Sequence, residues 1–205
     1  MTEHAIRDIP ALEALYGEVN ANSLAKEAHR LTPAYRRWIE AAPFLAIATS
    51  GPGGLDCSPR GDAVGQLFTV ADDSTLLIPD RRGNNRLDTL RNIVADPRVA
   101  LLFLIPGVNE TLRVNGRAVV STDPRLLERF LVDGKAPRTV LIVTIDRVYF
   151  QCARALIRSA LWSPAAHVAP GTVPTAGEMT KSALPEFDTD SYDAALRPRQ
   201  MGSLY

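Results

Sequence analysis

The sequence predicts a mainly β fold with flanking helices, of the α+β class, in which one antiparallel sheet closes into a barrel or sandwich. Short apolar runs recur along the middle of the chain, and most of them are separated only by a tight turn. Such short connections favour antiparallel pairing, because parallel neighbours need a long crossover. Helical periodicity occurs near the start of the chain and between some of the runs, so we expect helices to flank the sheet.

A helical N-terminal segment of about residues 10–42 is predicted before the sheet. Within it, Thr32 followed by Pro33 is typical of a helix cap with proline at the first helical position. This pair predicts a helix over 34–41, which Pro43 ends.

Six or seven strands follow, mostly joined as sequence neighbours. The first apolar run is closed by a turn rich in Gly and Pro, which predicts a buried strand and a hairpin. A kink is expected near Asp146, in the last strand region. Strands are predicted over residues 44–49, 55–60, 66–70, 75–78, 99–105, 111–121 and 139–152. Helices are predicted over residues 84–95, 123–131 and 153–162.

The length of 205 residues suits one domain with a sizeable core, which we expect over residues 1–164. Residues 165–205 hold many Pro, Gly, Ser and Thr and few apolar anchors. This composition predicts an extended or partly disordered C-terminal arm. Two interpretations stay open for the arm, a mobile terminus or a segment wrapped over a partner subunit.

Composition argues against several classes of function. The 23 Lys and Arg residues balance the 23 Asp and Glu residues, so no nucleic acid and no membrane are expected as main partners, since both favour a basic excess. Cys57 and Cys152 lie far apart and no signal-peptide pattern opens the chain, which suits a cytoplasmic location. The 3 histidines are scattered, and no metal site is expected.

The densest polar signal is the segment 79–86, Pro-Asp-Arg-Arg-Gly-Asn-Asn-Arg, between a predicted strand and a predicted helix. Free backbone N–H groups and the positive end of the helix dipole favour an anion at such a junction. Arginine adds charge-assisted hydrogen bonds suited to a phosphate, and asparagine adds neutral donors. The alternative is a solvated basic turn in which an asparagine caps the helix.

A second cluster, from Ser58 to Asp62, ends the strand predicted opposite this segment. Ser58 and Arg60 are two positions apart, so they leave the strand on the same face. If that face lines a groove with segment 79–86, an arginine from each side grips one anion. The alternative is a surface hairpin with an exposed charge pair.

Two further polar faces lie later in the chain. Thr111 and Arg113 belong to a polar stripe on one strand, a pattern that is usually the solvated side of an antiparallel sheet. Arg154, Arg158 and Trp162 recur every fourth residue, so they share one helical face. That face either binds a ligand ring or phosphate or packs with its arginines extended past the tryptophan.

No dinucleotide fingerprint, phosphate loop, metalloprotease motif or nucleophile elbow occurs in the sequence. No general acid or base is evident either, so the catalytic residues are unknown at this stage. We therefore expect any chemistry to come from a cofactor.

The order of the motifs resembles the pyridoxamine 5'-phosphate oxidase-like family of FMN-binding split barrels, over about residues 30–162. The matching run is Ser-Pro-Arg-Gly-Asp, then Ile-Pro-Asp-Arg-Arg-Gly-Asn-Asn-Arg, Asp-Pro-Arg, Val-Ala-Leu-Leu-Phe and Thr-Leu-Arg-Val-Asn-Gly-Arg-Ala. It is similar in particular to a bacterial subgroup whose substrates are mostly unassigned. The resemblance implies a six-stranded antiparallel split β-barrel that forms a homodimer, with FMN in two equivalent clefts at the interface.

The resemblance also implies roles for single residues as FMN contacts. The implied phosphate and ribityl contacts are Arg60, Arg82, Asn84, Asn85 and Arg86. The residues implied beside the isoalloxazine ring are Ser58, Ile78, Pro79 and Asp80. The implied contributions from the neighbouring subunit are Thr111, Arg113 on the same face, and Trp162 with Arg154 or Arg158. Here Gly-Asn-Asn-Arg replaces the family's usual Ser-Arg-Lys, so these contacts shift by a residue or two.

On this resemblance the expected function is that of a flavoprotein, an FMN-dependent oxidoreductase acting on an unidentified small molecule. The alternative is a non-catalytic module of the same fold that binds or sequesters flavin or haem. The family's vitamin B6 oxidases carry a C-terminal substrate motif of the Arg-Leu-His-x-Arg type. The sequence lacks this motif after Trp162, which argues against the pyridoxamine phosphate oxidase reaction itself.

Overall fold

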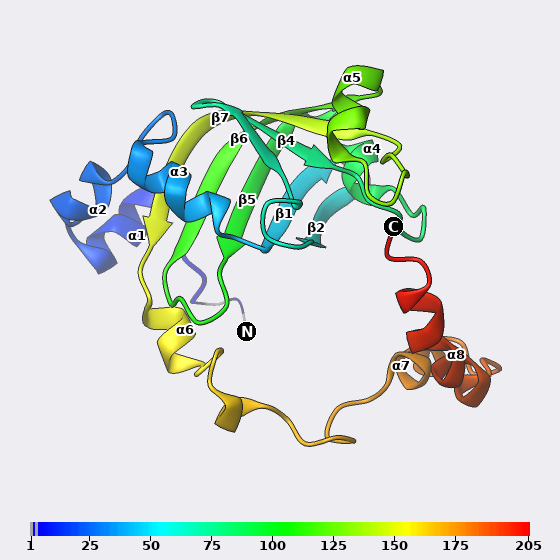
Figure 1. Cartoon of the computed structure of the whole chain (residues 1–205). Helices are drawn as coiled ribbons and strands as arrows, with labels where there is room; N and C mark the ends of the chain where they lie inside the picture. The colour runs from blue at the N-terminus through cyan, green and yellow to red at the C-terminus, as the bar shows by residue number, and fades with distance from the viewer. Residues whose placement is uncertain (1, 3) are drawn as a thin grey trace.

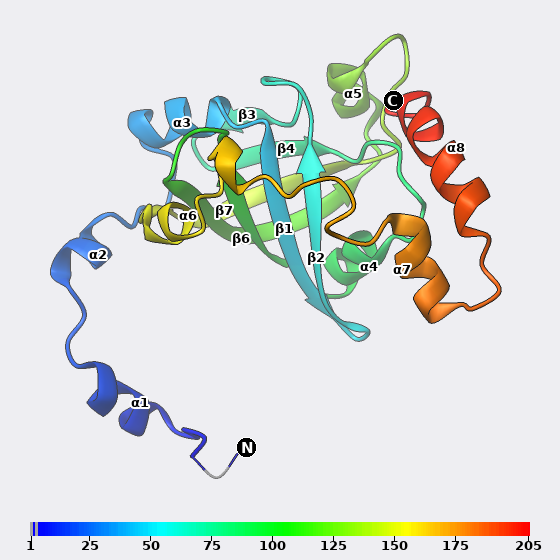
Figure 2. The ribbon, with the colours of Figure 1, turned by 90° about the horizontal axis from the view of Figure 1, so that it is seen from below.

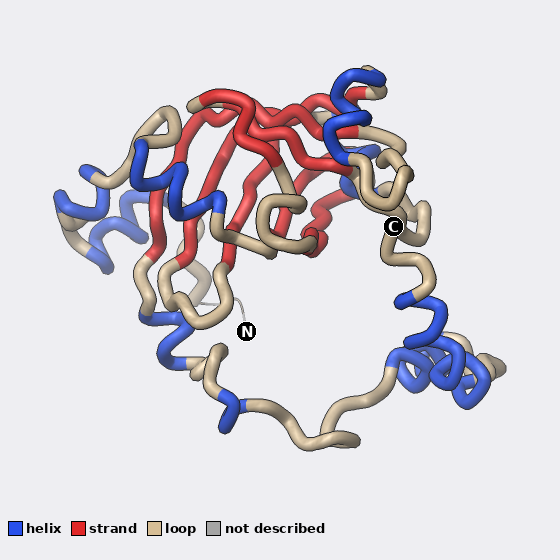
Figure 3. Tube along the Cα trace, viewed as in Figure 1, coloured by secondary structure: helices blue, strands red, loops and turns tan. Residues whose placement is uncertain are grey.

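The computed structural model describes residue 2 and residues 4–205. A curled sheet forms the body of the molecule, and helices and two projecting ends of the chain surround it (Figures 1 and 3). The strands are β1 (Phe44–Gly51), β2 (Gly54–Gly61), β3 (Thr69–Asp72), β4 (Thr75–Pro79), β5 (Arg98–Leu104), β6 (Thr111–Ser121) and β7 (Val140–Gln151). The α-helices are α1 (Ile9–Tyr16), α2 (Ala21–Ala25), α3 (Pro33–Glu40), α4 (Asp88–Ala95), α5 (Pro124–Leu127), α6 (Arg154–Arg158), α7 (Ala176–Ala183) and α8 (Thr189–Met201).

One antiparallel sheet in the described part of the chain contains seven strands, in the order β2-β1-β5-β6-β7-β4-β3. The α+β class and the antiparallel barrel predicted from the sequence are confirmed. The sheet has one strand more than the six that the resemblance implies, because the short edge strand β3 pairs with β4.

Strand β7 bends where the sequence predicted a kink. Asn115 of β6 pairs with Arg147, whereas the next residue, Gly116, pairs with Ile145, so Asp146 has no counterpart. This arrangement is a β-bulge, which bends a strand and increases its twist. The bend helps the sheet to curl, since β7 links β6 to β4 within it.

The core lies on the inner face of the curled sheet. Leu45 and Ile47 of β1 are buried and stand opposite Phe103 and Leu101 of β5. Phe68 packs edge to face against Phe103, with 5.3 Å between ring centroids. These alternating buried positions are the apolar residues whose spacing predicted the strands.

The N-terminal helices form as predicted, and α3 begins at Pro33. The hydroxyl of Thr32 accepts a hydrogen bond from the backbone N–H of Tyr35 at 3.2 Å and so caps α3. Helices α1 and α2 bury no residue among those described and project from the sheet (Figure 2). None of the helices among the described residues has the length and apolar character that crossing a bilayer requires.

Two of the later predicted helices are shorter than expected. The helix predicted over 123–131 consists of α5 and a 3-10 turn at Glu128–Phe130. The helix predicted over 153–162 ends at Arg158, and Ala160 adopts a left-handed φ of 50°. Trp162 therefore lies beyond the helix and does not continue the helical face of Arg154 and Arg158.

The C-terminal arm contains helices α7 and α8 as well as extended chain, which differs from the prediction. Thr175 and Glu178 form a capping box at the start of α7, with reciprocal hydrogen bonds of 3.1 and 2.7 Å. Phe187 packs edge to face against Tyr192 of α8, with 5.0 Å between ring centroids. The arm passes below the barrel and returns to it near the loop that follows α5 (Figures 1 and 2).

Candidate functional site

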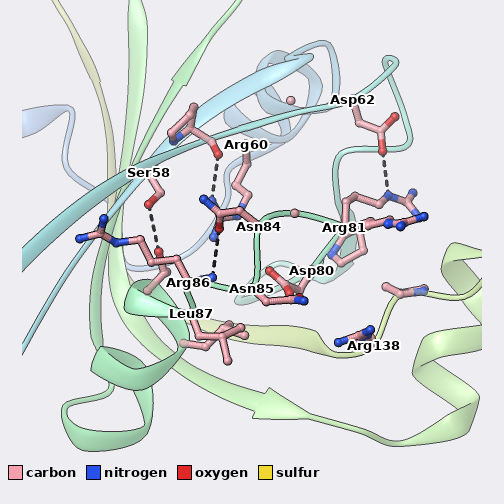
Figure 4. Close-up of a pocket in the computed structure, with 18 of the residues that line it drawn as sticks. Ser58, Arg60, Asp62, Asp80, Arg81, Asn84, Asn85, Arg86, Leu87 and Arg138 are labelled. Atoms are coloured by element: carbon pink, nitrogen blue, oxygen red, sulfur yellow. Dashed lines mark hydrogen bonds and ion pairs between the residues drawn. The ribbon is translucent and has the colours of Figure 1, made fainter. Parts of the chain in front are cut away.

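A cleft of about 810 Å³ opens between strand β2 and the loop of residues 80–87, which follows β4. The start of α4, residues 135–138 and Tyr205 complete its lining. Strands β2 and β4 lie near opposite ends of the sheet order, so the curl of the sheet brings these walls together. Figure 4 shows the polar side chains that surround the cleft. Its volume falls within the range of about 300 to 1,000 Å³ typical of cofactor sites.

The cleft brings together most of the residues predicted from segment 79–86 and from the end of β2. The predicted residues that line it are Ser58, Arg60, Pro79, Asp80, Arg82, Asn84, Asn85 and Arg86. Ile78 does not line it, because its side chain is only 1% exposed and belongs to the core.

Three predicted residues lie elsewhere on the same chain. Thr111 is buried at the start of β6. Arg113 donates a hydrogen bond to the hydroxyl of Tyr149 at 3.1 Å, and its guanidinium lies over the tyrosine ring. The indole N–H of Trp162 donates to the carbonyl of Val108 at 2.8 Å. None of the three lines the cleft of its own chain.

The loop before α4 is not helical, although the sequence predicted a helix from residue 84. Asn85 and Leu87 adopt left-handed φ values of 58° and 64°, which turn the chain before the helix begins at Asp88. The side-chain oxygen of Asn84 accepts the backbone N–H of Arg86 at 3.0 Å. Left-handed φ is unfavourable for leucine, and such backbone strain concentrates at functional sites.

The N-terminus of α4 opens onto the cleft without a side-chain cap among the described residues. Its first-turn residues Asp88, Thr89 and Leu90 line the cleft. Uncapped backbone N–H groups and the helix dipole make this end of the helix attractive to an anion.

The arginines of the cleft differ in how they are paired. Arg86 pairs with Asp88, and its side chain is 79% exposed. Arg60 donates to the carbonyl of Pro59 at 2.9 Å. Within the described residues, neither Arg60 nor Arg82 forms an ion pair with a carboxylate. These two guanidinium groups keep donors for a ligand.

A polar network joins β2 to α4 at one end of the cleft. The hydroxyl of Thr89 donates to Asp56 at 2.5 Å, and Ser58 donates to the same carboxylate oxygen at 2.9 Å. The hydrogen bond from Thr89, with smaller contributions from Ser58 and the charge of Arg60, lowers the pKa of Asp56 although burial opposes the shift. Asp56 is thus held as a carboxylate. Asp56 was not predicted as a site residue, although it stands two positions before Ser58.

Asp80 has the opposite environment. Burial raises the pKa of its carboxyl group, and the positive charge of Arg60 lowers it by less. The carboxyl group therefore binds a proton more readily than an exposed aspartate does. The backbone N–H of Asp80 donates to the carbonyl of Thr139 at 2.9 Å. This hydrogen bond fixes the start of the loop against the chain just before β7.

A buried ion pair supports the other end of the cleft. Arg81 and Asp62 meet at 2.9 Å, with side chains 18% and 2% exposed. Arg81 also donates to the carbonyl of Phe130 at 2.7 Å. Arg81 was not among the residues predicted for the site, although it lies inside the arginine-rich segment. No local pattern indicated that Lys135 and Tyr205 also line this end.

Residues 31–152 match the family model described as pyridoxamine 5'-phosphate oxidase. The chain belongs to the pyridoxamine 5'-phosphate oxidase family. Its split-barrel fold follows from this membership. A comparison with curated proteins found no match.

Several solved structures resemble part of this family member. HupZ of Group A Streptococcus is 17% identical, covers 58% of this chain and 91% of its own, and has a TM-score of 0.48. General stress protein 26 of Bacillus anthracis is 20% identical, with coverage of 56% and 88% and a TM-score of 0.40. The FAD binding protein of Mycobacterium smegmatis is 14% identical, with coverage of 60% and 97% and a TM-score of 0.42.

Proposed function

We propose that this protein is an FMN-binding flavoprotein that works as an FMN-dependent oxidoreductase on a small molecule. Membership of the pyridoxamine 5'-phosphate oxidase family supports the cofactor class. The observation that carries the proposal is the cleft, where Arg60 and Arg82 have no acidic partner among the described residues and share a lining with the uncapped start of α4. A phosphate suits this set of donors, because both bidentate arginines and free backbone N–H groups favour it.

The residues of the cleft fit FMN in their chemistry. Arg60 and Arg82, with Asn84 and Asn85, would hold the phosphate and the ribityl chain. Arg86 contributes less, because Asp88 already pairs with it. The hydroxyl and carboxylate oxygens of the network around Asp56 accept hydrogen bonds, as a polyhydroxyl chain requires.

Three other residues would lie beside the isoalloxazine ring. Ser58 and Asp80 present polar groups to the cleft, and Pro79 adds an apolar surface. Ile78 would support this wall from the core, because its side chain is buried.

A bound flavin supplies hydride acceptance and electron transfer, which no protein side chain provides. The chain's own residues bind and orient the cofactor. Among the aspartates that line the cleft, Asp80 has the one carboxyl group whose pKa is raised, so it binds a proton more readily than the others. Its position on the loop would place that proton next to the ligand.

We further propose a homodimer in which Thr111, Arg113 and Trp162 serve the cleft of a second copy. None of the three lines the cleft of its own chain, which supports this arrangement over a single-chain site. Exposed apolar side chains on α1, including Ile9, Leu15 and Tyr16, are consistent with a covering partner. Light scattering coupled to gel filtration tests the dimer.

The first test is the absorbance spectrum of the purified protein, followed by chromatography of what heat releases. We expect a flavin spectrum and released FMN. A colourless protein that also takes up no added FMN would contradict the proposal. If the protein binds FMN, the reduced form is then mixed with oxygen, quinones or nitro compounds, and the rate of flavin reoxidation is measured. In a binding module the bound flavin would reoxidise no faster than free FMN, whereas an oxidoreductase would exceed that rate with one of these acceptors.

The phosphate assignment has its own test. We expect Arg60→Ala to weaken FMN binding about 10- to 100-fold, because a charge-assisted hydrogen bond is lost. Arg91→Ala is the matched control, since Arg91 is an exposed arginine of α4 outside the cleft. Equal FMN affinity in both variants would remove Arg60 from the phosphate site.

A further inference from the structure

The C-terminal arm ends on the cleft of its own chain. After α8, the chain brings Tyr205 to the lining of the cleft. It lies at the end where Arg81 and Asp62 form the ion pair that Figure 4 shows. The hydroxyl of Tyr205 donates to Asp62 at 2.6 Å. Its ring lies over the guanidinium of Arg81, with 5.4 Å between the guanidinium carbon and the ring centroid. Lys135 donates to the backbone carbonyl of Tyr205 at 3.2 Å.

These contacts complete the environment of a buried carboxylate. One oxygen of Asp62 accepts from Arg81, and the other accepts from Tyr205 and from the backbone N–H of Ala63 at 2.8 Å. The hydrogen bond to Asp62 also raises the pKa of the Tyr205 hydroxyl, which keeps it protonated as a donor. Both members of the ion pair are thus shielded by one aromatic side chain.

The remainder of the arm makes few comparable contacts with the barrel. Helices α7 and α8 bind chiefly to each other, as in the hydrogen bond from the N–H of Gly177 to Asp193 at 2.8 Å. Helix α8 buries no residue among those described. Tyr205 is therefore the principal point at which this end of the chain engages the barrel.

Arg81 connects Tyr205 to the ligand-binding loop. It belongs to the loop of residues 80–87, next to Asp80 and Arg82. Its guanidinium is held on one side by Asp62 and Phe130 and covered on another by the Tyr205 ring. A side chain that fixes Arg81 also restricts the backbone from which the neighbouring cleft residues project.

We propose that Tyr205 is a positioning residue of the cleft, which holds Arg81 and Asp62 together and so keeps the loop of residues 80–87 in its ligand-binding conformation. This inference rests on the proposed function, in which the ligand of the loop is an anionic flavin. The arm is then part of the binding site. Tyr205 acts through Arg81 and does not need to contact the ligand.

The test compares Tyr205→Ala and Tyr205→Phe with the control Leu204→Ala. The alanine variant loses both the ring and the hydroxyl, and the phenylalanine variant keeps the ring over Arg81. Leu204 precedes Tyr205, is 53% exposed and does not line the cleft, so its truncation leaves the cleft unchanged. Hydrogen exchange of residues 80–87 without flavin and the rate of FMN release are measured for each, with the midpoint of thermal unfolding as a check on folding.

We expect Tyr205→Ala to accelerate both exchange in the loop and FMN release about tenfold, with a smaller effect for Tyr205→Phe and none for the control. Exchange in β1 and β5 should stay as in the wild type, because a merely structural role would accelerate it there too. Unchanged loop exchange in Tyr205→Ala overturns the proposal, as does acceleration spread over the whole barrel. If the wild type binds no FMN, the proposed function fails, while loop exchange still decides the role of Tyr205.

Discussion

The hydroxyl of Thr89, near the start of α4, donates a 2.5 Å hydrogen bond to the carboxylate of Asp56 on β2. Thr89 is buried, with 4% exposure, and the bond ties the helix that borders the cleft to the strand across from it. Because this hydrogen bond is the largest cause of the lowered pKa of Asp56, it stabilises the folded chain more strongly while that carboxyl group is ionised.

We expect Thr89→Val to lower the free energy of unfolding by about 1–2 kcal/mol at neutral pH, because a hydrogen bond to a charged group is lost. The folded pKa of Asp56 lies below its unfolded value, so this stabilisation is present above about pH 4 and is lost as the pH falls through the folded pKa. Urea unfolding at pH 7 and pH 3 measures the difference. Thr89→Ser, which keeps a hydroxyl, should lose less, and an equal loss at both pH values would rule out this role.

The ion pair between Arg81 and Asp62 gives a second prediction, on stability. Asp62 is almost fully buried, so Arg81→Met leaves an uncompensated charge, and we expect a cost of about 3–5 kcal/mol. Asp62→Asn removes that charge, so the double variant should lose clearly less than the sum of the single variants. Denaturant unfolding of all four proteins measures the coupling. Additive losses would show that the two side chains do not act as a pair.

The contribution of Asp80 to stability should depend on pH in the opposite sense to that of Asp56. Burial raises its folded pKa above the unfolded value, so its ionised form costs stability at neutral pH, and that cost disappears as the pH falls toward the unfolded value. We expect Asp80→Asn to raise the midpoint of thermal unfolding at pH 7, with a gain that shrinks by pH 4. Asp190→Asn, at an exposed position of α8, controls for the loss of one negative charge. A gain that is independent of pH would contradict the assignment.

The sequence predicted the strands well because burial alternates along them. Leu45 and Ile47 point into the core from one strand, and this period of two is visible without any partner. The start of α4 and the end of α6 were predicted less well. Leu87 precedes α4 and Ala160 follows α6, and both adopt left-handed φ, although neither is a glycine or proline that would signal a helix boundary in the sequence.

The cleft was predictable where its residues are neighbours in sequence. The arginines and asparagines of segment 79–86 follow one strand, so a strand-to-loop junction was enough to group them. Tyr205 and Lys135 reach the same cleft only because the arm folds back and the sheet curls. No local pattern encodes such long-range contacts, and Thr111 and Trp162 stay predictions that concern a second copy of the chain.

The bulge at Asp146 provides the last prediction, because Gly116 on the neighbouring strand β6 has no room for a side chain. A Cβ atom built on Gly116 would lie 2.1 Å from the carbonyl oxygen of Thr144, and that oxygen belongs to backbone that cannot rotate away. We expect Gly116→Ala to destabilise the fold by about 1–3 kcal/mol, as overpacking does, since β6 and β7 must separate to admit the methyl group. Gly53→Ala is the matched control, because the corresponding Cβ meets no atom within 4 Å. Urea unfolding compares the free energies of unfolding of the two variants. Equal stability would mean that the bulge adapts without cost. A loss confined to Gly116→Ala would show that the close approach of β6 and β7 maintains the bend of β7.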